Sequence, residues 1–407
     1  MPKPERRTRA DLIAAASIVV LVVVLATLVW WRSPERHTSD EVASGPVVPA
    51  PAALQVPTAF TEAWSAPSPA TALPTVESGA VVTADSGSVV GRDARTGRQI
   101  WKYQRDIALC GVVGAWDRAV SVYRDRRGCS EVTALDAATG VRQPQRSSLA
   151  DHTVQLSTNG TYVVSRGDTR LEVWRSDLVR TLEYGRVDAP VNPDAQPRTG
   201  CTLRSDGIGN SRLAVVETCP GEQGDRLTVM SPAPKDPGKP EPYGSTILIG
   251  NGQAVRGARI LAVSGQLTAV FLPGTTAQIG IFDGDANLIS AYPVATPPDG
   301  GADVTAAVDD SSMFTFWTGD STVALNAIDL TPRWTVPGTL GPGTMMAGSL
   351  LVPTPGAVAV VDVVTGRENA RIPVPRPENV RGPIGLAATG DMLLERRGPE
   401  LVALKGS

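Results

Sequence analysis

Two different patterns of hydrophobic residues divide the chain. From Leu12 to Trp31 the residues are almost all apolar and none is charged. At about 1.5 Å per residue, a helix over this run is about 30 Å long, the thickness of a bilayer core. From Phe60 onward, short runs of Val, Ile, Leu, Thr and aromatic residues alternate with Gly, Asp, Asn and Pro. The sequence therefore predicts one membrane-length helix followed by an all-β domain.

The apolar run, residues 12–31, is predicted to be an uncleaved transmembrane helix. The alternative is a signal peptide, whose apolar region is only about 7–15 residues long. Here the run is longer and ends in Trp30-Trp31-Arg32, an aromatic pair and a charge typical of a membrane interface. The residues before the run are mostly basic: Lys3, Arg6, Arg7 and Arg9. By the positive-inside rule, residues 1–11 are expected in the cytoplasm and the rest of the chain outside it.

Residues 32–58 are rich in Pro, Ala and Ser and have no hydrophobic periodicity. We expect this segment to be a flexible linker without regular elements, holding the domain away from the membrane. The predicted domains are therefore a cytoplasmic tail (1–11), a transmembrane helix (12–31), a linker (32–58) and an extracytoplasmic β-domain (59–407).

A five-residue motif, D-x-x-T-G, occurs three times after short strand-like runs. Asp can accept hydrogen bonds from the following backbone amides, Thr adds a second local hydrogen bond, and Gly can take a positive φ. The motif is therefore predicted to be the turn between the third and fourth strands of a repeat. A repeat of about 40 residues is typical of a blade of a β-propeller. The turn residues are Asp93, Thr96, Gly97, Asp136, Thr139, Gly140, Asp362, Thr365 and Gly366.

Eight units of about 44 residues can be aligned on their third strands, which predicts an eight-bladed β-propeller. Seven blades is the alternative, because the unit near Ser231 is interrupted by a Pro-rich loop and the last unit stops after its third strand. The orphan segment Phe60–Ser65 is expected to supply the missing fourth strand and close the ring. Its Trp64, together with Trp101 and Trp334, is expected to pack between neighbouring blades.

Four cysteines form two pairs with similar spacing. An even number of cysteines in an extracytoplasmic domain indicates disulfides. The first cysteine of each pair begins a first strand, and the second lies near the turn before a third strand. These positions meet at one end of an antiparallel blade, so the predicted disulfides are Cys110–Cys129 and Cys201–Cys219. The spacing lacks the C-x-x-C or histidine partners of a zinc site, and we predict no metal site.

The first unit, Gly79 to Trp101, resembles the repeat of the PQQ-binding-like β-propellers, a superfamily that includes quinoprotein alcohol dehydrogenases and the BamB lipoproteins. The resemblance covers most of residues 60–407 and implies an eight-bladed ring. Quinoproteins have two adjacent cysteines, and no two cysteines are adjacent here, so we predict no cofactor. The layout is also similar to that of Ala/Val-rich, single-pass membrane propeller proteins of mycobacteria and their relatives.

The sequence singles out no catalytic residues. The histidines are His37, in the linker, and His152, and there is no G-x-S-x-G motif. The segment Asp283–Asn287 is similar to the start of a calcium loop, but it lacks the later Gly and Glu of an EF-hand, so a tight turn is expected. The net charge of −3 gives no sign of nucleic-acid binding.

Two loops are candidates for binding. The basic loop Arg124–Arg127 has the charge to hold an anionic partner or lipid head groups, and a solvated hairpin loop is the alternative. The loop Pro232–Pro242 has the composition of a peptide-recognition segment, and a simple insertion is the alternative.

We expect a non-catalytic protein-interaction scaffold in the bacterial cell envelope. It would be held in the plasma membrane by residues 12–31 and bind other envelope or membrane proteins. Two alternatives stay open. One is an envelope enzyme, a glycan hydrolase or lyase or an oxidoreductase, and the other is a sensor that binds a ligand in the propeller funnel.

Overall fold

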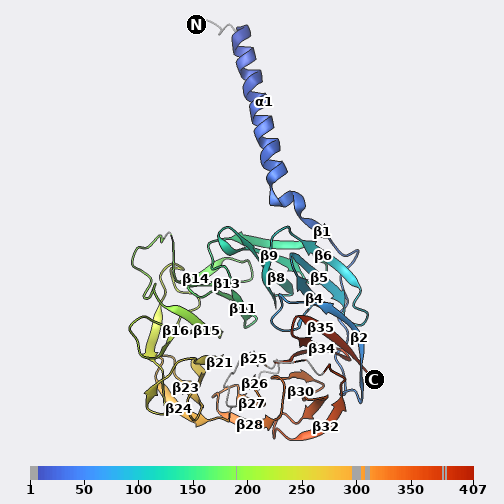
Figure 1. The fold of residues 1–407 in the computed structure, drawn as a ribbon, viewed down its shortest axis with the longest axis vertical. Coiled ribbons are helices and arrows are strands. Elements are labelled where there is room, and N and C mark those ends of the chain that lie inside the picture. The colour runs from blue at the N-terminus through green and yellow to red at the C-terminus, as the bar shows by residue number, and fades with distance from the viewer. Residues whose placement is uncertain (1–7, 189, 296–303, 308–311, 378–379, 381–382) are drawn as a thin grey trace.

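The computed structural model describes residues 8–188, 190–295, 304–307, 312–377, 380 and 383–407. Eight antiparallel sheets are arranged around a common centre, with α1 (Arg9–Arg32) projecting from one side (Figure 1). Each of these sheets is one blade with four strands of its own, and in the described residues the sheet of blade 1 gains β1 as a fifth strand. Blades 1 to 7 follow one another along the chain, and blade 8 combines the last three strands with the early strand β2. The eight-bladed β-propeller is therefore confirmed, and the seven-bladed alternative is wrong.

The first four blades are regular meanders. Blade 1 contains β3 (Thr75–Glu77), β4 (Ala80–Asp85), β5 (Ser88–Asp93) and β6 (Gln99–Gln104). Blade 2 contains β7 (Leu109–Ala115), β8 (Arg118–Asp125), β9 (Gly128–Asp136) and β10 (Arg142–Ser147). Blade 3 contains β11 (Gln155–Thr158), β12 (Val163–Arg166), β13 (Arg170–Trp174) and β14 (Arg180–Gly185). Blade 4 contains β15 (Thr202–Ile208), β16 (Leu213–Thr218), β17 (Asp225–Met230) and β18 (Pro242–Ile247).

A short hairpin, β19 (Ile249–Gly250) and β20 (Gln253–Ala254), leads into the second half of the ring. Blade 5 contains β21 (Arg259–Ser264), β22 (Leu267–Leu272), β23 (Gln278–Phe282) and β24 (Leu288–Pro293). Blade 6 contains β25 (Val304–Ala307), β26 (Met313–Trp317), β27 (Ser321–Asn326) and β28 (Pro332–Pro337). Blade 7 contains β29 (Thr344–Met346), β30 (Ser349–Thr354), β31 (Ala357–Val361) and β32 (Glu368–Pro373).

Blade 8 closes the ring with strands from both ends of the domain. It contains β33 (Gly385–Thr389), β34 (Met392–Arg397), β35 (Glu400–Gly406) and β2 (Phe60–Pro67). The early strand β2 pairs antiparallel with the last strand β35, from Phe60 opposite Gly406 to Pro67 opposite Glu400. The orphan segment therefore supplies the fourth strand, as predicted, and this closure leaves no incomplete blade.

The hydrophobic core lies between the blades. Middle strands such as β31 and β13 are buried along their whole length, because a neighbouring blade covers each face of the sheet. This explains their continuous runs of apolar residues. Fourth strands such as β28 alternate between exposed and covered positions, as expected for strands at the outer edge.

The turns of the repeat join neighbouring blades. In blade 2, the Asp136 carboxylate accepts hydrogen bonds from the backbone amide of Thr139 (2.9 Å) and from its hydroxyl (2.7 Å). Gly140 has a φ of 77°. The indole of Trp101, from blade 1, lies against Gly140 and donates to the Ala137 carbonyl at 2.8 Å. A side chain at position 140 would collide with that indole.

The same contact recurs at the two other copies of the motif. Trp64 of blade 8 packs on Gly97 of blade 1 and donates to the Ala94 carbonyl. Trp334 of blade 6 packs on Gly366 of blade 7 in the same way. The three tryptophans therefore each tie one blade to the turn of the next.

The segment after α1 is more ordered than the sequence suggests. Pro34–His37 form a 3₁₀ helix, and Ser39–Glu41 form β1, which pairs with β6 at the outer edge of blade 1. The expectation that residues 32–58 contain no regular element is therefore wrong at these two places. The physical reason is that β6 has an open backbone edge and Ser39–Glu41 contains no proline.

From β1 the chain crosses one face of the ring. The backbone amide of Ala43 donates to the Thr139 carbonyl at 2.8 Å. Further on, Pro49 lies close to Gly79, and Val56 packs against the core between blades 7 and 8. The segment thus connects blades 1, 2 and 8 before it enters β2.

The helix α1 contains the predicted residues 12–31. Thr8 caps its N-terminus in a capping box with Asp11. No described residue of the helix is buried by the protein, and the helix is long and apolar enough to cross a membrane. At its other end, the guanidinium of Arg36 lies over the rings of Trp30 and Trp31.

We predict that Trp101→Ala lowers the free energy of unfolding by about 3–5 kcal/mol, because it removes a fully buried indole from the contact between blades 1 and 2. Trp101→Phe keeps most of the apolar contact and loses the hydrogen bond, so a loss of about 1 kcal/mol is expected. Urea unfolding of the full-length protein in detergent micelles measures both. Ile328→Ala, at an exposed turn position, is the control. Equal midpoints for Trp101→Ala and the control would contradict the interblade contact.

Candidate functional site

The antiparallel meander divides the loops between two faces of the ring. The turns after first and third strands, which include the D-x-x-T-G turns, lie on one face, here called the turn face. The turns after second strands and the connections between blades lie on the other, the connection face. The polar atoms of Asp93, Asp136 and Asp362 are engaged within their own turns. These predicted residues therefore have a structural role in the turns of the turn face.

Both disulfides join the predicted cysteines, Cys110 to Cys129 and Cys201 to Cys219. Each ties the start of a first strand to the turn between second and third strands of the same blade. Both therefore lie on the connection face, in blades 2 and 4.

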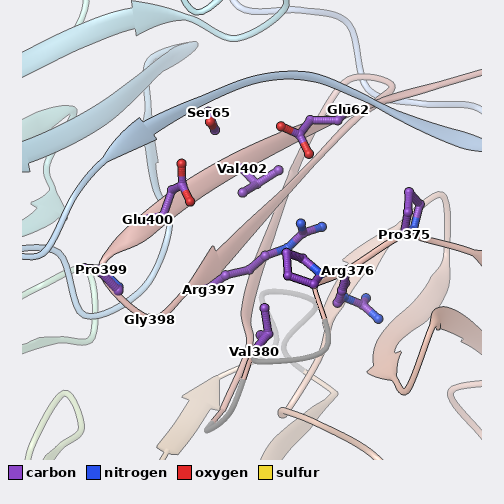
Figure 2. Close-up of a pocket in the computed structure, with 11 residues that line it drawn as sticks. Glu62, Ser65, Pro375, Arg376, Val380, Arg397, Gly398, Pro399, Glu400 and Val402 are labelled. Atoms are coloured by element: carbon purple, nitrogen blue, oxygen red, sulfur yellow. The ribbon is translucent and has the colours of Figure 1, made fainter.

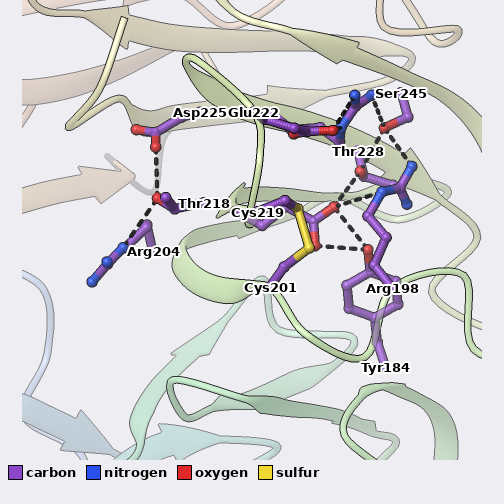
Figure 3. The surroundings of a disulfide bond; sticks show 12 residues. Tyr184, Arg198, Cys201, Arg204, Thr218, Cys219, Glu222, Asp225, Thr228 and Ser245 are labelled. Atoms are coloured by element: carbon purple, nitrogen blue, oxygen red, sulfur yellow. Dashed lines mark hydrogen bonds and ion pairs between the residues drawn. A yellow bond between two sulfur atoms is a disulfide. The ribbon is translucent and has the colours of Figure 1, made fainter.

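A buried glutamate, Glu217, lies close to the second disulfide. Figure 3 shows the surroundings of this disulfide. The Glu217 carboxylate accepts hydrogen bonds from the Tyr184 hydroxyl at 2.9 and 3.0 Å and from the Thr228 hydroxyl at 2.7 Å. Burial raises the pKa of Glu217 above its usual range. A Glu217 oxygen and the sulfurs of Cys201 and Cys219 lie within 4.8 Å of one another. Because the two sulfurs are bonded to each other, they are not thiolate ligands, and this group is not a metal site.

The basic loop of blade 2 is partly neutralised. Arg127 forms ion pairs with Asp125 at 3.0 Å and with Glu131 at 2.5 Å. Arg126 is exposed, whereas Arg124 is half-buried. The loop therefore presents less free positive charge on the connection face than its sequence suggests.

The Pro-rich loop of blade 4 packs against blade 3. The Pro237 carbonyl accepts the backbone amide of Glu183 at 2.9 Å, and the Pro232 carbonyl accepts the Thr181 hydroxyl at 2.8 Å. Glu183 and Thr181 belong to β14, so the loop covers the outer edge of that strand. These contacts favour the insertion over the peptide-recognition segment.

The Asp283–Asn287 segment is a tight turn, as expected. One Asp283 oxygen accepts the backbone amides of Asp285 (2.9 Å) and Asn287 (2.8 Å). The two histidines are exposed, and His152 precedes β11.

A pair of carboxylates lies on the turn face, at the inner ends of blades 1 and 2. Burial, and then the neighbouring Asp117 carboxylate, raises the pKa of Glu77 to about 7. Asp117 in turn accepts a hydrogen bond from the Ser78 hydroxyl at 2.8 Å. No sequence pattern marks this pair, because its members are 40 residues apart.

One cavity, of about 760 Å³, opens between the outer part of blade 8 and the connection from blade 7 (Figure 2). Two buried guanidiniums, of Arg376 and Arg397, contact the fully buried Glu395 carboxylate at 2.7 Å. Glu62 and Glu400 also line this cavity. Because carboxylates balance the two guanidiniums, the cavity has no excess of positive charge.

Two further cavities lie at the inner strands. One of about 770 Å³ is lined by blades 3 to 6 near the turn face. Here the Asp206 carboxylate accepts hydrogen bonds from Ser157 and Arg166. The other, of about 620 Å³, is lined by the first strands of blades 2 and 3 and by the connection from blade 8 to blade 1.

The fold is that of an established class of β-propellers. No family model and no curated protein sequence matches the chain. The crystal structure of BamB from Moraxella catarrhalis matches with a TM-score of 0.51 and 13% identity, covering 85% of this chain and 99% of that chain. A crystal structure of a mitotic checkpoint complex matches with a TM-score of 0.44 and 11% identity, covering 89% of this chain and 96% of the matched chain.

The chain is thus an eight-bladed, BamB-like β-propeller in its fold. The resemblance found in the first repeat agrees with this similarity.

We predict that replacing Cys110 and Cys129 together by Ser lowers the free energy of unfolding by about 3 kcal/mol, the chain-entropy value for a loop of this length. Urea unfolding of the full-length protein, followed by tryptophan fluorescence, measures the change. Wild-type protein with a reducing agent should show the same loss or a larger one, since both disulfides then open. An unchanged midpoint for the double variant would contradict a stabilising disulfide.

We also predict that Glu77 makes the stability fall as the pH rises. A carboxyl group whose pKa is higher in the folded state contributes stability below its unfolded-state pKa of 4.5, and this contribution is lost as the pH rises through about 7. Between pH 5 and 8, the Tm of the wild-type protein should therefore fall more than that of Glu77→Gln. The matched control is Glu400→Gln, which replaces an exposed glutamate. Parallel pH profiles for wild type and Glu77→Gln would contradict the prediction.

Proposed function

We propose that this protein is a membrane-anchored, non-catalytic scaffold that binds other proteins of the bacterial cell envelope. α1 is inserted in the plasma membrane with residues 1–11 in the cytoplasm and the propeller outside. The two disulfides support an extracytoplasmic location of the propeller, because disulfides persist in oxidising surroundings. The fold similarity to BamB supports a scaffold as an analogy of fold.

The observation that carries the proposal is the short attachment of the ring to α1. The helix ends at Arg32, and β1 pairs with blade 1 from Ser39 onward. The chain between Arg32 and Ser39 spans at most about 25 Å even when fully extended. The rim of blades 1 and 2 is therefore held close to the membrane surface, where weak contacts with neighbouring membrane proteins gain from high effective concentration.

The proposal predicts that the full-length protein forms specific protein crosslinks in living cells. A photo-crosslinking residue is placed at one exposed position on each surface: Arg126 on the connection face, Val364 on the turn face, and Ile289 on the outer strand β24. One surface should give discrete protein adducts that mass spectrometry identifies as an envelope or membrane protein.

The other two positions serve as controls for chance encounters. With the crosslinking residue at position 126, charge reversal at Arg127, the other exposed arginine of the loop, should abolish the adduct if the basic loop makes the contact. Diffuse adducts at all three positions, with a small molecule or glycan retained on the purified protein, would contradict the scaffold and support a ligand-binding or enzymatic role.

A further inference from the structure

The cavity of about 620 Å³ at the inner strands has features of a peptide-binding site. Its walls come from the first strands β7 and β11, the segment from Pro69 to Thr75, and Arg396 of β34. Its size lies within the range of about 300–1,000 Å³ that is typical of ligand pockets.

Arg396 gives this cavity an uncompensated positive charge. The residue is half-buried, and its Nε atom is buried without a hydrogen-bond partner among the described residues. Its Nη2 donates to the Pro69 carbonyl at 3.3 Å. The residues that line the cavity include no aspartate or glutamate. Burial lowers the pKa of Arg396. A bound carboxylate would complement this guanidinium with charge-assisted hydrogen bonds.

The backbone of the cavity wall shows how an extended chain can bind there. The chain's own Ala70 and Thr71 lie along β7, where the backbone amide of Val112 donates to the Ala70 carbonyl at 2.8 Å and Thr71 forms a parallel bridge to Val112. The neighbouring first strand, β11, pairs on one side with β12. Within the described part of the chain, no backbone hydrogen bond joins the other edge of β11 to another segment. Such an open edge can accept an extended peptide.

The remaining wall is largely aliphatic. Ala70, Ala72, Leu73, Val113 and Leu156 line the cavity. Such a surface favours small and medium aliphatic side chains and gives no partner for a second charge.

We propose that this cavity binds the C-terminal residues of a partner protein in extended form. The terminal carboxylate pairs with Arg396, the peptide backbone pairs with the open edge of β11, and about three aliphatic residues fill the space, at roughly 3.3 Å per residue. This inference rests on the proposed scaffold function and assigns it one contact on the connection face.

The test uses the full-length protein in detergent micelles. The probes are dye-labelled hexapeptides whose last three positions are mixtures of Ala, Val and Leu, each made with a free C-terminal carboxylate and as the C-terminal amide. Fluorescence anisotropy gives the two affinities. We expect the amides to bind roughly 10- to 100-fold more weakly, the range for hydrogen bonds to charged groups.

Two variants and a control locate the site. Arg396→Gln should weaken binding of the free acids to the level of the amides and leave the amides unchanged. Ala72→Trp, at an exposed position in the wall, should fill the cavity and abolish binding of both. Arg98→Gln, an exposed arginine on the turn face, should change neither. Thermal melting confirms that each variant is folded.

Three results would overturn the proposal: no peptide binds, acids and amides bind equally, or Arg396→Gln leaves their ratio unchanged. Decanoate is a further probe. If decanoate binds and the peptides do not, the proposal is also overturned, and the cavity is a site for a fatty acid. The cellular crosslinks separate this failure from that of the scaffold. If a partner is captured in cells but the peptides do not bind, the scaffold function is supported and the peptide-binding site is refuted.

Discussion

The pairing of β2 with β35 is the interaction on which the rest of the ring depends. It joins residues about 340 positions apart, from Phe60 opposite Gly406 to Pro67 opposite Glu400. The same strand carries Trp64, which packs on the D-x-x-T-G turn of blade 1, and Phe60, which joins the core of blades 7 and 8. The segment before β2 leads back over the ring to β1 and α1. One strand therefore closes the ring and connects it to the membrane-length helix.

Neighbouring blades are held together by polar as well as apolar contacts. Where the D-x-x-T-G turn is present, a tryptophan of the preceding blade packs on its glycine. Blade 3 lacks this turn, and there Arg146 of blade 2 donates to the Leu178 carbonyl at 2.8 Å and lies over the ring of Trp174. Arg146 also forms an ion pair with the buried Glu172 at 3.2 Å. Because breaking one member of such a buried network leaves a charge unpaired, its contribution is sensitive to single substitutions.

The sequence predicted the blades because each is built from local contacts. The turn motif, its spacing and the paired cysteines all lie within single units, and Trp64 marked the closing strand. The sequence could not predict the polar contacts between blades, because these bring together residues that are far apart in the chain. One missed signal was the alternation in Arg170-Leu171-Glu172-Val173-Trp174, a buried third strand in which Arg170 and Glu172 form an ion pair at 2.7 Å. The pairing of β1 with β6 had no comparable signal, because three polar residues in a Pro-rich segment are typical of a linker.

The central claim is that β2 closes the ring as a full strand of blade 8. Amide hydrogen exchange of the full-length protein, read by mass spectrometry, tests it most directly. The amides of residues 60–67 that donate to β35 should be protected as strongly as those of β34 and β35, because all three strands belong to one sheet. Exchange of residues 60–67 as fast as that of exposed turns, with β35 protected, would show that the ring is closed in some other way and would contradict this account.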